Sequence, residues 1–127
     1  VIGLMNEWVK GEKIIKGTDK NLGGTMRLGS YEARLLENSL INKIYKSTKI
    51  NERHRHRYEV NIAFKEKFEK KGMFFSGLSP DGKLPEIIEL KNHPWFIGVQ
   101  FHPEFKPRPV APQPLFSSFI KSSKNHK

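Results

Sequence analysis

The chain has 127 residues, no cysteine, and 23 Lys and Arg against 13 Asp and Glu, which gives a formal net charge of +10. This length suits one domain or part of one, and the lack of cysteine excludes disulfides, thiolate metal sites and cysteine nucleophiles within the chain. No apolar stretch approaches the ~20 residues that a membrane-spanning helix requires, so no membrane partner is expected.

The positive charge fits either an anionic partner such as nucleic acid or a lysine-rich solvated surface. Because the lysines are spread along the chain rather than gathered in one stripe, we favour the solvated surface and do not expect nucleic acid. The chain opens with Val-Ile-Gly-Leu and no signal-peptide pattern. We interpret this opening as the inside of a strand, and therefore expect a longer parent chain, located in the cytoplasm.

The N-terminal half is predicted to hold strands, a loop and one helix. Residues 1–8 are expected to form a buried strand, residues 9–24 a glycine-containing loop and residues 25–36 a second strand. Residues 38–45 carry apolar side chains at helical spacing, with Asn38 or Ser39 as the N-cap. Residues 50–60 alternate charged and other side chains, which predicts an extended segment.

The C-terminal half is predicted to contain a helix over residues 62–71, ended by Gly72, and then a hairpin. The hairpin strands are residues 73–77 and 86–90, joined by the turn sequence Ser-Pro-Asp-Gly at 79–82. The apolar run 95–101 is predicted to be a fully buried central strand. A short helix over 115–121 and a frayed basic tail over 122–127 complete an α/β fold with a mixed sheet and flanking helices.

His102 and Glu104 follow the apolar run 95–101 and form the strongest candidate site. In an extended segment, residues two apart point to the same face, and catalytic groups often lie just past the carboxyl ends of strands in α/β sheets. A carboxylate can hold an imidazole in one tautomer and stabilise its protonated form. The pair predicts acid–base chemistry, and the alternative is a turn in which both side chains are merely solvated.

Residues 52–59 read Glu-Arg-His-Arg-His-Arg-Tyr-Glu, which places three arginines on one strand face and two histidines on the other. The arginines could bind a ligand carboxylate, contact nucleic acid phosphates, or pair with Glu52 and Glu59 in a charged strand. The two histidines could ligate a metal, but two ligands are few for a metal site. Paired glycines at 23 and 24 indicate a tight junction between a loop and a strand.

These segments, in this order, resemble the C-terminal part of the CTP synthase family, within its class I glutamine amidotransferase (glutaminase) domain. The family shows a Gly-Gly-Thr-Met-Arg-Leu-Gly segment, matched at 23–29, and an Arg-His-Arg-His-Arg run followed by an aromatic residue and Glu, matched at 53–59. It also shows His-Pro-Trp-Phe and Gln-Phe-His-Pro-Glu-Phe, matched at 93–96 and 100–105. The resemblance covers nearly the whole chain.

The resemblance implies that the parent enzyme hydrolyses glutamine and uses the ammonia to convert UTP to CTP. By motif, His102 and Glu104 match the catalytic histidine and glutamate of a Cys-His-Glu triad, and Arg57 matches the arginine that holds the glutamine α-carboxylate. The parent would use ATP and Mg, with GTP as activator, and would be a homotetramer. Residues 16–24 loosely resemble a lid linked to GTP activation.

The nucleophile elbow, the oxyanion hole and the whole amidoligase domain of the family lie upstream of the matched segment. The expected partners are therefore glutamine and these missing parts. We expect residues 1–121 to be a partial amidotransferase domain that is inactive alone and marginally stable, and residues 122–127 to be a tail. The alternatives are a basic nucleic-acid-binding module and a non-catalytic subunit of a split amidotransferase.

Overall fold

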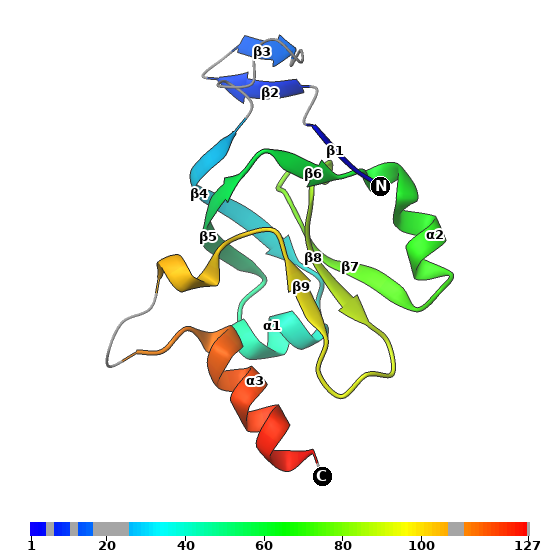
Figure 1. The fold of residues 1–127 in the computed structure, drawn as a ribbon, viewed down its shortest axis with the longest axis vertical. Helices are drawn as coiled ribbons and strands as arrows, with labels where there is room; N and C mark the ends of the chain where they lie inside the picture. Colours follow the sequence, from blue (N-terminus) through cyan, green and yellow to red (C-terminus); the bar gives the residue numbers. More distant parts are fainter. Residues whose placement is uncertain (5–6, 11–12, 17–25, 107–110, 127) are drawn as a thin grey trace.

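The computed structural model describes residues 1–4, 7–10, 13–16, 26–106 and 111–126 (Figure 1). Its centre is a five-stranded sheet in the order β5-β4-β7-β8-β9. The strands are β4 (Arg27–Leu35), β5 (Lys49–His56), β7 (Met73–Leu78), β8 (Pro85–Leu90) and β9 (Ile97–Val99). All neighbouring strands of this sheet are antiparallel. The sequence predicts a mixed sheet, and the described residues contribute antiparallel strand pairs to it.

The longest strands, β4 and β5, are joined through helix α1 (Leu40–Tyr45), as the alternating and helical patterns predict. Ser39 is the N-cap, and its side chain accepts a hydrogen bond from the Asn42 amide. The helix ends at Tyr45, and the following Lys46 adopts a left-handed conformation and donates its amide proton to the Asn42 carbonyl. Thus one of the two predicted N-caps is confirmed.

The predicted hairpin is confirmed as β7 and β8. At the turn, the Gly82 amide donates to the Ser79 carbonyl at 2.8 Å, and Gly82 has a φ of +73°, which glycine adopts without strain. The predicted helix before it is a short 3₁₀ turn, η2 (Ile62–Phe64), followed by α2 (Lys65–Glu69). Gly72 lies just beyond this helix with a φ of +83°.

Two small sheets flank the main one. Strand β1 (Ile2–Leu4) pairs with β6 (Tyr58–Val60), and β2 (Glu7–Lys10) pairs with β3 (Lys13–Lys16) in a hairpin at the top of Figure 1. The prediction of one buried strand over residues 1–8 is wrong, because the segment contributes to two different sheets and Ile2 is 68% exposed. Residues 13–16 are likewise a strand and not loop, whereas residues 17–24 lie outside the described part.

The prediction of a buried central strand over residues 95–101 is also wrong. Only Ile97–Val99 form a strand, β9, which is half-buried and lies at the edge of the sheet. The chain then curls back toward the opposite edge, where the His102 amide donates to the Arg53 carbonyl of β5 at 2.8 Å. This apolar segment therefore belongs to a curled sheet whose two edges approach each other.

Helix α3 (Pro114–Asn125) lies beside α1 below the sheet in Figure 1. It continues to Asn125, so residues 122–125 are helical and not the frayed tail that the basic composition predicts. The core joins both helices to the sheet through Ala33, Leu35, Ile41, Ile50, Ile87, Phe101 and Leu115. Within the described residues, no helix has the length and apolar character needed to cross a membrane.

Candidate active site at the edge of strand β5

His102 and Glu104 lie together at the edge of β5, as their spacing predicts. His102 Nδ1 and Glu104 Oε1 are 2.8 Å apart, and 35% of the His102 side chain is exposed. The 3₁₀ turn η3 (Pro103–Phe105) brings the carboxylate back to the ring. The hydrogen bond from His102 lowers the pKa of the Glu104 carboxyl below its ordinary value. An ionised Glu104 fixes the proton on Nδ1 and leaves Nε2 as an accessible base.

The chain segment around this pair is anchored to β5 on both sides, by a backbone contact before it and by a side chain after it. At the start, the His102 amide binds the Arg53 carbonyl at 2.8 Å. At the end, Lys106 Nζ donates to the Asn51 carbonyl and lies 3.8 Å from Glu52 Oε2. The Phe105 ring also stacks on the His102 ring, with a centroid distance of 5.0 Å. The site is therefore tied to β5 even though its side chains face solvent.

The arginine run follows the predicted alternation along β5 and departs from it at the end. Arg53 and Arg55 are exposed, and His54 between them is buried. Arg57 lies in the bend between β5 and β6, where it is half-buried. The alternative in which these arginines pair with Glu52 and Glu59 is wrong, since those carboxylates pair instead with Lys106 and Arg27.

The two histidines of the run contact each other. His54 Nδ1 and His56 Nε2 are 2.8 Å apart, so each ring uses a nitrogen in a hydrogen bond to the other. Across the described part of the chain, no group of three or more suitable side chains could hold a metal ion. The pair therefore belongs to the polar interior of the sheet.

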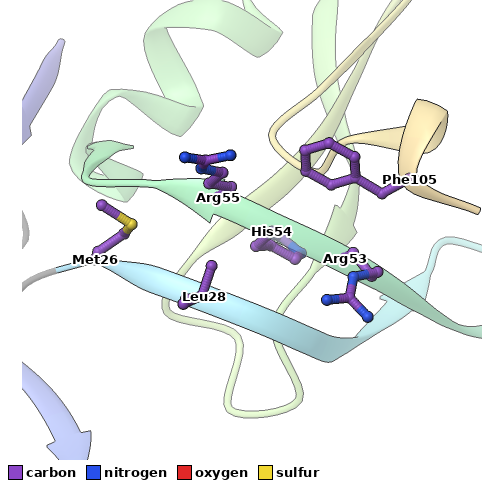
Figure 2. Close-up of a pocket in the computed structure, with 6 residues that line it drawn as sticks. All are labelled: Met26, Leu28, Arg53, His54, Arg55 and Phe105. Carbon is purple, nitrogen blue, oxygen red and sulfur yellow. The ribbon is translucent and has the colours of Figure 1, made fainter.

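A cavity of about 550 Å³ lies between β4, β5 and η3. Two guanidinium groups and three exposed apolar side chains share its wall, and the buried His54 forms part of its floor. Figure 2 shows these side chains along the two strands, with Phe105 reaching over from η3. The lining residues are Met26, Leu28, Arg53, His54, Arg55 and Phe105. Through Phe105 the cavity adjoins His102, whereas Arg57 is not among its lining residues.

The model of the class-I glutamine amidotransferase family matches residues 6–122. The chain belongs to this family. It is 81% identical over 127 residues to the CTP synthase of Pelagibacter ubique and 62% identical over 124 residues to that of Hyphomonas neptunium. These matches include 100% and 97% of this chain, but the chain spans only 24% and 23% of the length of those relatives.

A solved structure agrees with the family assignment. The glutaminase domain of Trypanosoma brucei CTPS with bound acivicin is 38% identical, with a TM-score of 0.75, over 80% of this chain and 41% of that chain. The class I amidotransferase fold expected from the sequence is thereby confirmed. The chain corresponds to the C-terminal part of the glutaminase domain of these relatives.

This amidotransferase chain also holds a buried ionic network that the sequence patterns did not predict. Arg27 pairs with Glu59 at 3.3 Å and with Glu86 at 2.7 Å, and all three residues are buried. Gln100 donates to Glu59 Oε2 at 2.7 Å. A signal was present, because Arg27 falls on the same alternating face of its strand as the buried Ala33 and Leu35.

Proposed function

We propose that this chain provides the acid–base pair and the substrate-binding arginine of the glutaminase site in a CTP synthase. The site would hydrolyse glutamine and supply ammonia for the ATP-dependent amination of UTP to CTP. The observation that carries the proposal is the 2.8 Å contact between His102 Nδ1 and Glu104 Oε1, in a chain 81% identical to a CTP synthase. Glutamine is the proposed ligand of this chain.

His102 acts through Nε2, which Glu104 leaves unprotonated by binding the proton on Nδ1. Nε2 removes the proton from a cysteine thiol supplied by another segment of the enzyme, and the thiolate attacks the glutamine amide. His102 then protonates the departing ammonia and activates the water that hydrolyses the thioester. Because the chain contains no cysteine, it hydrolyses no glutamine alone.

Arg57 binds the glutamine α-carboxylate through its planar guanidinium, which suits two parallel hydrogen bonds. Arg57 lies in the bend that follows β5, four residues after Arg53, whose carbonyl accepts a hydrogen bond from the His102 amide. Four residues span at most ~13 Å even when fully extended, and an arginine side chain together with a bound glutamine can bridge this distance. Arg57 therefore orients the amide toward His102.

The parent enzyme would bind ATP and Mg in its amidoligase domain, respond to GTP, and act as a cytoplasmic tetramer. Within the part of the chain that the structure describes, no cluster of three or more metal-ligating side chains is present. The contribution of this chain is the ammonia-producing half reaction.

The test replaces the C-terminal segment of the Pelagibacter ubique CTP synthase with this chain, to give a chimeric enzyme. We expect His102→Ala to abolish glutamine-dependent CTP formation while CTP formation from added ammonia persists. Glu104→Gln should lower the glutamine-dependent kcat, and Arg57→Lys should chiefly raise the KM for glutamine. His126→Ala, at the end of α3, is the matched control and should retain both activities. Retention of glutamine-dependent activity by His102→Ala would overturn the proposal.

A further inference from the structure

One contact joins the two chain segments that carry Arg57 and His102, the groups that must act together in the proposed glutaminase site. Arg57 precedes Glu59 by two residues, and His102 follows Gln100 by two residues. Gln100 Nε2 donates to Glu59 Oε2 at 2.7 Å. We propose that this hydrogen bond sets the spacing between Arg57 and His102, which makes Glu59 and Gln100 positioning residues. The inference rests on the proposed function and deepens it.

Gln100 is held through its side-chain amide group and its backbone amide. Its side-chain amide donates to both Glu59 Oε2 and the Pro85 carbonyl, the latter at 2.6 Å. Its backbone amide donates to the Glu86 carbonyl at 2.9 Å. The side chain of Gln100 is thus bound to β6 and β8, and its backbone is bound to β8. These contacts fix the direction in which the chain continues from Gln100. The position of His102 at the edge of β5 therefore depends on the position of Gln100.

Glu59 is also held on its other oxygen, by a longer contact. Its side chain is buried, and Oε1 lies 3.3 Å from Arg27 Nη1. Arg27 in turn reaches Glu86 Oε1 at 2.7 Å, and Glu86 belongs to the same strand start that binds Gln100. The contacts close a ring through Arg27, Glu59, Gln100 and the beginning of β8. A closed ring resists displacement more than a single contact, because each member restrains its neighbours.

The ring matters for catalysis because the reaction needs two simultaneous contacts on one substrate. Arg57 fixes the carboxylate end of glutamine, and His102 must serve the group that attacks the amide end. A misplacement of about 1 Å can cost on the order of 100-fold in rate. A fixed distance between Arg57 and His102 also selects the length of the substrate. An amino acid amide whose side chain is one methylene shorter than that of glutamine cannot contact both residues at once.

The experiment compares glutamine with asparagine, its shorter analogue, as substrates of the chimeric enzyme. The measured quantity is the ratio of kcat/KM for glutamine to kcat/KM for asparagine. This ratio does not depend on how much of the enzyme is folded. We expect Gln100→Leu to lower the ratio by about 10-fold or more, because Arg57 and His102 are no longer held at the distance that matches the two ends of glutamine.

Glu59 provides a second pair of variants. Glu59→Gln has one acceptor oxygen, so it can accept from Gln100 only by giving up the contact with Arg27. It should therefore lower the ratio less than Glu59→Asp, which withdraws both oxygens from their partners. Glu89→Gln is the control, because Glu89 is a buried carboxylate that binds α1 and does not touch the ring. A ratio that stays unchanged in Gln100→Leu and Glu59→Asp, while His102→Ala still abolishes hydrolysis, would overturn this inference alone. Hydrolysis that survives His102→Ala would overturn the proposed function itself.

Discussion

The Glu86 carboxyl is buried beside Arg27, and two opposing effects act on it. Burial raises its pKa from the ordinary 4.5 to about 7, and this outweighs the lowering caused by Arg27. The nearby His54 ring lies 3.6 Å from Glu86. Burial lowers the pKa of His54 from 6.5 to about 3, with Arg27 as the next cause. The interior thus favours a protonated carboxyl beside a neutral imidazole.

These two groups predict opposite pH dependences of stability. Between pH 4.5 and about 7, the folded state keeps a proton on Glu86 that the unfolded state releases, so its contribution to stability is lost as the pH rises. Between pH 3 and 6.5, His54 works the other way, and its contribution appears as the pH rises. We expect Glu86→Gln to leave the His54 effect unopposed, so that the unfolding free energy rises from pH 4.5 to 6.5 relative to the parent. The rise should be up to about 3 kcal/mol, at ~1.4 kcal/mol per pKa unit.

Pulse proteolysis in urea on the chimeric enzyme measures this change at several pH values. His54→Asn is the complementary variant, since it leaves the Glu86 effect and should make stability fall over the same range. Parallel pH profiles for the parent and Glu86→Gln would contradict the assignment of a raised pKa to this carboxyl.

The His102–Glu104 contact could be predicted from the sequence because both partners lie within two residues, so local geometry decides whether they meet. The Arg27–Glu59–Glu86 network could not be predicted in the same way. Its members are more than 25 residues apart in sequence, and only the strand order brings them together. The roles of Arg57, His102 and Glu104 remain predictions.

At the scale of elements, α1 is too short to be stable without its caps. Glu89 of β8 accepts hydrogen bonds from the Leu40 and Ile41 amides at 2.9 and 3.0 Å, and Ser39 accepts one from Asn42. We expect Ser39→Ala to cost about 1 kcal/mol. Glu89→Ala should cost about 2 kcal/mol or more, since two charge-assisted bonds are lost in a buried place. The urea midpoint of each variant measures these costs, and a larger loss for Ser39→Ala would contradict this ranking.

The β7–β8 hairpin depends on a glycine for its packing. A methyl group added at Gly77 would lie 2.7 Å from Ile87 Cδ1 and 3.0 Å from Ile87 Cβ. Ile87 is 1% exposed and cannot move without disturbing the core. We therefore expect Gly77→Ala to destabilise the domain by about 1–3 kcal/mol. Gly98→Ala, whose added methyl would meet the half-buried Ile88, should cost less, and equal urea midpoints for the two variants would contradict the packing argument.

Local patterns predicted β4, α1, β5 and the β7–β8 hairpin, because turn residues and helical spacing act over short distances. The same kind of pattern gives the wrong prediction for residues 1–8 and 95–101, whose short apolar runs predict buried strands. Apolar character does not distinguish a central strand from a segment that crosses a curled sheet. Whether such a run is central or at the edge depends on partners that are distant in sequence.

At the scale of the whole molecule, the surface of α3 is unusually apolar for an exposed helix. Phe116, Phe119 and Ile120 are 47%, 48% and 58% exposed. A group of exposed apolar side chains such as this is typical of a surface that contacts another protein segment. Phe119 also packs on Trp95, with a ring centroid distance of 5.0 Å, which continues the apolar surface onto the loop before β9.

We therefore expect the isolated chain to associate with further copies of itself or to unfold over a broad temperature range, because exposed apolar side chains favour contacts between copies. Sedimentation of the purified chain should show concentration-dependent association. Phe116→Lys together with Ile120→Lys should reduce it, since both side chains face solvent and neither forms the core. Lys121→Glu, on the same helix, changes a charge and leaves the apolar surface, so it should retain association. A monomer that unfolds sharply and cooperatively would show that the 127 residues form a self-sufficient domain and would refute this expectation.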